Sequence, residues 1–166
     1  MIPVRAYLSP GLPLACNPRL VLDAVDRWRL WTVTDIRPDE APMGTIYPPK
    51  EWGWGEKWAH IPLVPAGCCY LFPCVPGTNI RGCVWQGGAS VMVCPGDSLE
   101  TLELRAVHEL IHALGLPADD MRAWIRSSLP MALIYIVTRC LRLRTEESWQ
   151  RLYYHHLLSE WRKTNA

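Results

Sequence analysis

The sequence lacks a marked excess of either sign of charge. It holds 17 lysines and arginines against 16 aspartates and glutamates, which gives a formal net charge of +1 over 166 residues. Proteins that bind nucleic acid or an anionic membrane through their overall charge carry a clear basic surplus. We therefore expect neither a nucleic-acid nor a membrane partner.

The sequence also lacks an apolar run long enough to span a bilayer, which takes roughly 20 residues. The most apolar stretch, PMALIYIVTRCLRL at residues 130–143, is shorter and is interrupted by Arg139, and it predicts a buried helix. The N-terminal stretch MIPVRAYLSPGLPLAC contains several prolines and no apolar signal-peptide core. The expected location is therefore the cytoplasm, or a compartment reached by another route.

Cysteine pairs with C-x-x-C spacing are missing, although the chain has 7 cysteines. A zinc ribbon, which needs such pairs, is therefore not indicated. Two alternatives stay open, namely buried free thiols or disulfides, as in an extracellular protein or in a thermophile's cytosol. The cysteines are Cys16, Cys68, Cys69, Cys74, Cys83, Cys94 and Cys140.

What the sequence does have is the composition of a folded protein, with 49% hydrophobic and 20% charged residues. A chain of this length typically forms one core, so we expect a single domain over residues 1–166. Short β-rich stretches occur in the first half, and longer stretches of helical periodicity occur mainly in the second half. These patterns predict an α+β fold.

The elements follow from local patterns. Asn17 before Pro18 is typical of a helix N-terminus, and Gly115 after the run 99–114 is typical of a helix end. Gly87-Gly88 between two β-rich runs predicts a hairpin. Expected strands are residues 2–9, 32–36, 60–64, 68–72, 80–86 and 89–94, and expected helices are residues 18–31, 99–114, 119–128, 130–143 and 146–163.

The stretch LRAVHELIHALGLPADD, residues 104–120, contains H-E-x-x-H within one of these predicted helices. The spacing places His108 and His112 one turn apart on one face, where both imidazoles can bind one ion. Zinc suits imidazole ligands on a rigid helix. Glu109 can then take a proton from a zinc-activated water as that water attacks a carbonyl. The pattern predicts Zn²⁺ held by His108 and His112, with Glu109 as general base.

At VHELIHALGLP the chain resembles the active-site helix of the metzincin zinc peptidases, most of all the matrixin-like ones. Their motif H-E-x-x-H-x-x-G-x-x-H is matched here by His108, Glu109, His112 and Gly115. The runs IPVRAYL, LDAVDRW and TVTDI are similar to the start of that fold. The resemblance covers roughly residues 2–135, specifically at the motif and loosely elsewhere.

The resemblance implies a zincin-like domain with a twisted mixed sheet, an N-terminal helix, an active-site helix and a helical C-terminal part. It implies a zinc-dependent endopeptidase acting on a peptide or protein substrate. The strand ASVMVC would be the edge strand over the cleft, and an extended substrate would pair with it. The family's methionine turn would correspond to Met131 or, less well placed, Met121.

The third metal ligand departs from the family, because its position is Ala118, which has no donor atom. Gly115 and Pro117 turn the chain out of the helix, and the side chains that follow are carried back toward the histidines. We expect Asp119 to be the ligand, with Asp120 second. More distant alternatives are Glu146, Glu147 and His60.

A second function stays open, namely a non-catalytic zinc-binding or structural module that keeps the peptidase fold. The intact Glu109 favours the enzyme, and the missing third histidine favours the module. The turn-rich loop of residues 37–60 is either a specificity loop or a loop packed on the core through its tryptophans, which are Trp52, Trp54 and Trp58.

Overall fold

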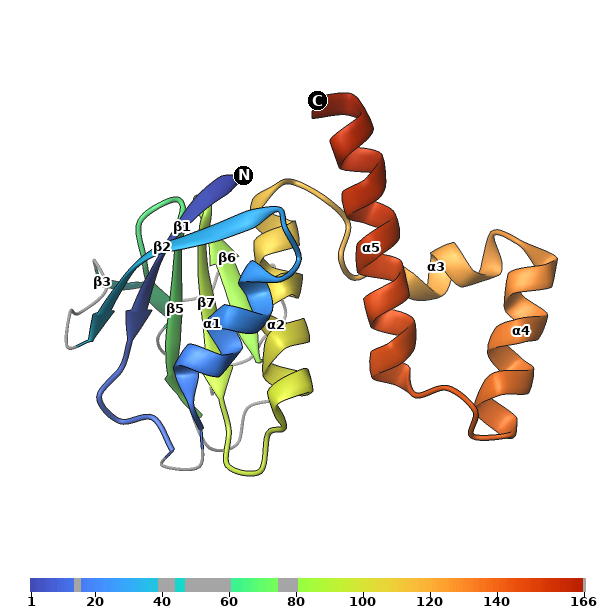
Figure 1. Cartoon of the computed structure of the whole chain (residues 1–166), viewed down its shortest axis with the longest axis horizontal. Helices are drawn as coiled ribbons and strands as arrows, with labels where there is room; N and C mark the ends of the chain where they lie inside the picture. Colours follow the sequence, from blue (N-terminus) through green and yellow to red (C-terminus); the bar gives the residue numbers. More distant parts are fainter. Residues whose placement is uncertain (14–15, 39–43, 47–60, 75–80, 166) are drawn as a thin grey trace. The chain divides into compact units, whose positions relative to one another are not determined.

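The computed structural model describes residues 1–13, 16–38, 44–46, 61–74 and 81–165. The chain forms two compact units, Met1–Leu114 and Gly115–Ala166, and the expectation of a single domain over 1–166 stays a prediction. The first unit holds a mixed sheet with two helices, and the second unit is helical (Figure 1). The predicted α+β class is confirmed.

The main sheet has five strands in the order β2-β1-β5-β7-β6. The four strands β2, β1, β5 and β7 run parallel to one another, and β6 joins β7 antiparallel at the edge. A separate antiparallel pair is formed by β3 (Gly44–Ile46) and β4 (Ile61–Leu63). The strands of the main sheet are β1 (Ile2–Leu8), β2 (Trp31–Pro38), β5 (Cys68–Pro73), β6 (Gly82–Trp85) and β7 (Gly88–Val93).

The predicted hairpin is confirmed, with its turn one residue earlier than expected. Strand β6 pairs with β7 so that Trp85 faces Gly88. The two turn residues are Gln86 and Gly87, with φ values of 48° and 81°. Positive φ at both central positions is the type I′ geometry, whose twist matches that of the flanking strands. The expectation that residues 89–94 form the edge strand is wrong, because β7 lies between β5 and β6.

Helix α1 (Pro18–Asp26) begins as predicted and ends earlier than predicted. The side chain of Asn17 accepts a hydrogen bond from the backbone N–H of Arg19, and Pro18 occupies the first turn. The chain leaves the helix through Arg29, whose φ is 57°. Trp31, which we expected on this helix, is instead the first residue of β2.

Helices α1 and α2 (Leu99–Ala113) lie together on one face of the sheet (Figure 1). Strand β5 is buried along almost its whole length, as expected for a central parallel strand covered on both faces. Its alternate residues Cys68, Tyr70 and Phe72 belong to an apolar cluster. The other buried members of this cluster are Tyr7, Val64, Cys83 and Met92. All seven cysteines are free thiols.

Most of the loop expected at 37–60 lies outside the described residues, and so do Trp52, Trp54, Trp58 and His60. Strand β2 extends through Pro38, and β3 falls within the expected loop. No helix in the described ranges combines the length and hydropathy needed to cross a bilayer.

The second unit consists of α3 (Met121–Arg126), α4 (Leu129–Cys140) and α5 (Glu146–Asn165). Its interior includes Trp149, Tyr153 and Leu158 of α5, and the Tyr153 ring packs against Trp124 with centroids 5.3 Å apart. The prediction of helices in this region is confirmed. The prediction that the apolar run 130–143 is buried is wrong, because α4 has no buried residue.

Candidate metal centre

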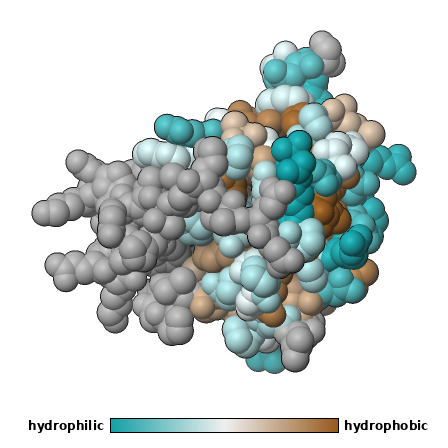
Figure 2. All heavy atoms as spheres, turned by 90° about the vertical axis from the view of Figure 1, so that its left-hand side faces the viewer, coloured by the Kyte–Doolittle hydropathy of each residue, from teal (hydrophilic) through white to brown (hydrophobic). Residues whose placement is uncertain are grey.

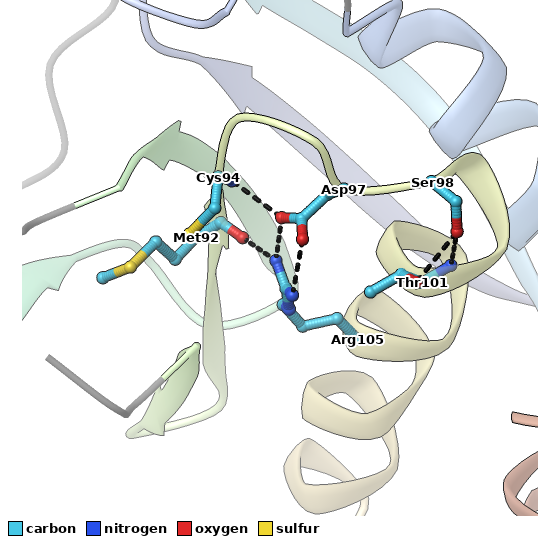
Figure 3. Close-up of polar contacts among 6 residues, drawn as sticks. All are labelled: Met92, Cys94, Asp97, Ser98, Thr101 and Arg105. Carbon is cyan, nitrogen blue, oxygen red and sulfur yellow. Dashed lines mark hydrogen bonds and ion pairs between the residues drawn. The ribbon is translucent and has the colours of Figure 1, made fainter. Parts of the chain in front are cut away.

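Polar contacts at its N-terminus fix helix α2, which carries H-E-x-x-H. The hydroxyl of Ser98 accepts a hydrogen bond from the backbone N–H of Thr101 at 3.1 Å. The Arg105 guanidinium donates to both carboxylate oxygens of Asp97, at 2.7 and 3.3 Å (Figure 3). Asp97 also accepts from the backbone N–H of Cys94, directly after β7. The N-terminal half of the helix that carries both histidines is therefore tied to the end of a central strand.

His108 and His112 lie one turn apart on α2, as the spacing predicts. Their Nε2 atoms are 3.1 Å apart, and the rings meet edge to face with centroids at 4.6 Å. Two nitrogens bound to one tetrahedral zinc at about 2.0–2.1 Å would be roughly 3.3 Å apart. The two side chains are therefore already close to the separation that joint ligation requires.

Glu109 is buried against the sheet. The residue is 6% exposed, and Glu109 and Ser90 are the buried polar residues in the described part of the chain. The carboxylate lies directly on the backbone of Gly82 in β6, where an added Cβ would come within 2.7 Å of the Glu109 Cδ. Burying a carboxylate costs free energy unless it is well compensated. Glu109 follows His108 directly and is held against Gly82, which makes it a candidate functional group beside the histidines.

The negative charge of Glu109 affects the pKa values of two thiols in the sheet, those of Cys69 and Cys83. Burial, followed by the negative charge of Glu109, raises the pKa of Cys69 to about 12. The same two causes raise the pKa of Cys83 to about 12. Both thiols are therefore protonated at neutral pH, and neither has the lowered pKa of a catalytic cysteine.

The chain leaves α2 through Gly115, which has a φ of 79°, as expected for the residue after a helix C-terminus. The backbone N–H of Asp120 bonds to the Pro117 carbonyl at 3.2 Å. The Tyr153 hydroxyl donates to the same carbonyl at 2.6 Å. The turn after α2 is thus fixed by hydrogen bonds of its own.

Within this turn Ala118 and Asp119 differ in exposure. Ala118 is 3% exposed, whereas Asp119 is exposed. One potential ligand atom from each of His108, His112 and Asp119 lies within 4.8 Å of the others. Exposed carboxylates often lie near histidines without any ion, so ligation by Asp119 stays a prediction.

The other proposed ligands have different surroundings. Asp120 occupies the N-cap position of α3, but its side chain makes no capping hydrogen bond. Glu146 accepts hydrogen bonds from Arg122 at 2.9 Å and from the Tyr135 hydroxyl at 3.1 Å. Glu147 lies beside it in the first turn of α5.

The two candidates for the methionine turn lie in helices. Met131 is the third residue of α4, where its backbone N–H is capped by Ser128. Met121 is the first residue of α3 and is buried. Assignment of either residue to a methionine turn stays a prediction.

Sequence reasoning missed Gly82, on whose backbone the Glu109 carboxylate rests. The available signal was the position of this glycine inside the run IRGCVWQ, because a glycine within a strand often marks a close approach of another group. The sequence did not identify that group. The contact also shows that β6 is the strand beside the motif.

Comparison of the chain with models of known protein families, with curated proteins and with solved structures finds no match in any of the three.

Proposed function

We propose that this protein is a zinc-dependent metallopeptidase with a metzincin-like fold, in which His108, His112 and Asp119 hold the metal and Glu109 acts as general base. The observation that carries the proposal is the grouping of two imidazoles and a carboxylate within 4.8 Å of one another, with a buried glutamate next to the first histidine. Two histidines and one carboxylate make up a common ligand set of catalytic zinc sites.

The donor set suits zinc. Neutral imidazole nitrogens and a carboxylate oxygen are ordinary zinc ligands, and three protein ligands leave one coordination position open. The Nε2 separation of 3.1 Å requires little rearrangement of the histidines. A bound zinc ion would supply Lewis-acid chemistry, lowering the pKa of a water molecule toward about 7 and polarising a carbonyl group.

Glu109 is suited to moving a proton beside this site. It follows His108 directly on α2, and its carboxylate is confined between the helix and Gly82. A side chain held in one position can accept a proton from water and pass it to the leaving amine without first having to become ordered. Since Gly82 belongs to β6, the general base and this strand meet at the same place.

Strand β6 supports a peptide as the substrate. Among the described strands it pairs on one side only, with β7, at the end of the sheet. An unpaired strand edge presents N–H and C=O groups to which an extended peptide can add as a further strand. A peptide paired with β6 would run past Gly82 and so close to Glu109.

A non-catalytic metal-binding module is the second candidate. The specific observation in its favour is Ala118, which stands at the family's third ligand position and is buried. The number of protein ligands separates the two proposals, because structural zinc sites have four and catalytic sites keep one position open.

The test combines metal analysis with a matched pair of variants on the same helix. We expect one zinc per chain in protein purified without added metal, and hydrolysis of some members of a quenched-fluorescence peptide library. Glu109→Gln should keep the zinc and lose about 10²–10⁴-fold in rate, whereas Glu100→Gln, at an exposed position of α2, should keep both. A chain without bound metal would reject both candidates, and a zinc-loaded chain that cleaves nothing would favour the module.

A further inference from the structure

The exposed face of α4 is a continuous apolar stripe. Leu129, Leu133, Ile136 and Val137 are 72%, 54%, 55% and 51% exposed. Their spacing of four, three and one residues places them along one side of the helix. Leu141 and Leu143, directly after the helix, are also exposed, at 63% and 71%. The surface formed by these six residues is called the α4 stripe below.

Single apolar side chains are normal on a protein surface, whereas contiguous ones mark an interaction site. On the face of the molecule drawn in Figure 2, the described hydrophobic residues lie among hydrophilic ones. The α4 stripe differs because its members follow one another along a helix and the segment directly after it.

The opposite side of α4 packs within the second unit. The Tyr135 ring meets Trp149 of α5 edge to face at 5.2 Å, and its hydroxyl donates to Glu146. Arg139, on the same side, lies 3.7 Å from Glu146. These contacts fix the rotation of the helix, so the stripe faces away from α5.

The charged residues before, within and after α4 are all arginines. Residues 121–144 contain no aspartate, glutamate or lysine, and their charged residues are Arg122, Arg126, Arg139, Arg142 and Arg144. Arg122 and Arg139 pair with Glu146, and Arg144 lies over the Trp149 ring. Arg126 precedes α4 and Arg142 follows it, and neither forms an ion pair with any described residue.

We propose that the α4 stripe and its flanking arginines form a docking surface for an anionic phospholipid membrane, a partner that the net charge of +1 of the whole chain does not predict. An apolar helix face embeds at the boundary between acyl chains and headgroups, while flanking arginines reach anionic headgroups. At 12 residues, α4 is about 18 Å long and cannot cross a hydrocarbon core of about 30 Å. It lies in the interface plane instead.

The arginines favour a membrane over a second copy of the chain as the partner that covers the α4 stripe. Two stripes packed face to face would bring Arg126 and Arg142 of each copy together, and like charges at an interface are unfavourable. An anionic bilayer neutralises both arginines while it covers the stripe. This surface differs from the metal centre, and the proposal does not depend on hydrolysis.

The test is sedimentation of the full chain with vesicles of phosphatidylcholine alone and of phosphatidylcholine mixed with phosphatidylserine. We expect binding to the mixed vesicles only. Leu133→Ser/Ile136→Ser should abolish binding, and Arg126→Gln/Arg142→Gln should weaken it by roughly fivefold per arginine. One matched control is Leu20→Ser/Leu152→Ser, at exposed leucines of other helices. The other is Arg19→Gln/Arg27→Gln, at exposed arginines in the first turn of α1 and directly after its end. Both should bind as the wild type does.

Circular dichroism of every variant separates lost binding from lost folding. The proposal is overturned if the wild type fails to sediment with the mixed vesicles, or if the stripe and arginine variants sediment as it does. It is also overturned if light scattering shows a dimer that Leu133→Ser/Ile136→Ser dissociates while no vesicle binding occurs. In that case a second copy covers the stripe.

Discussion

The Glu109 carboxylate and the backbone of Gly82 are in such close contact that a Cβ at Gly82 would lie 2.8 Å from the Glu109 Cγ. Real Cβ contacts are essentially never that short. The pair joins the middle of α2 to the edge strand β6. A larger residue at position 82 would displace the carboxylate of Glu109, the proposed general base.

Gly82→Ala should therefore destabilise the fold or displace Glu109, at a cost of about 1–3 kcal/mol. Glu109→Ala removes the atoms that the new methyl group would meet, so Gly82→Ala should cost little in that background. Urea unfolding of the two single variants and the double variant measures this coupling. Additive effects would show that the two residues do not constrain one another.

Zinc affinity should depend on Asp119. Removal of residues one shell beyond a metal's ligands typically costs 10–100-fold in affinity, so Asp119→Ala should cost at least about 100-fold. The matched control is Asp120→Ala, which changes a neighbouring carboxylate that lies outside the three-residue group. Competition titration with a chromogenic chelator gives both values. If Glu146→Ala/Glu147→Ala weakens binding and Asp119→Ala does not, the ligand assignment is wrong.

Features set by neighbours in sequence could be predicted, because their causes are local. The cap at Asn17, the helix end at Gly115 and the turn-spacing of His108 and His112 depend on a few consecutive residues. The expected edge strand, residues 89–94, was wrong for the opposite reason. Strand order depends on pairing between distant segments, and both strands of the β6–β7 hairpin have similar local patterns.

The exposure of α4 was also not predictable from its own sequence. An apolar helical run predicts a buried helix, but whether it is buried depends on other segments of the chain that would have to pack against it. The second unit covers only the side that carries Tyr135 and Arg139. The contact of Glu109 with Gly82 joins residues of two elements, and the spacing of H-E-x-x-H contains no information about it.

The ion pair between Asp97 and Arg105 should stabilise the first unit. Their side chains are 15% and 11% exposed, and the shortest N–O distance is 2.7 Å. Loss of one partner from a buried pair leaves an uncompensated charge, so Asp97→Ala should cost about 3 kcal/mol. Asp35→Ala, which removes an exposed pair with Arg37, should change stability little. Equal effects of the two substitutions in urea unfolding would contradict this prediction.

The same ion pair makes the stability of the fold depend on pH in the acid range. Burial opposes the charge of Asp97, but hydrogen bonds from Arg105 and the Cys94 N–H, with the charges of Arg105 and Arg81, hold its pKa below the ordinary value. The unfolded chain therefore binds a proton at higher pH than the folded chain does. The stabilisation is fully present above about pH 4 and is lost as the pH falls through the folded pKa. The difference in free energy of unfolding between the wild type and Asp97→Ala, measured by urea unfolding, should therefore shrink as the pH falls below about 4.

At alkaline pH the buried thiol of Cys69 should limit stability. Burial, then the charges of Glu109 and Cys68, raise its pKa to about 12, whereas an unfolded cysteine titrates near 8.5. Above that pH the unfolded chain loses a proton that the folded chain keeps, so stability falls as pH rises from about 8.5 toward 12. At pH 10 the loss amounts to about 2 kcal/mol.

Urea unfolding at a series of pH values, under reducing conditions, measures this effect in Cys69→Ala and the wild type. The variant should be less stable at pH 7 because a buried sulfur has been removed, and its stability should fall less steeply between pH 8 and 10. Cys140→Ala is the matched control, because Cys140 is exposed, and its curve should parallel that of the wild type. Parallel curves for Cys69→Ala and wild type would mean that Cys69 does not carry the alkaline loss.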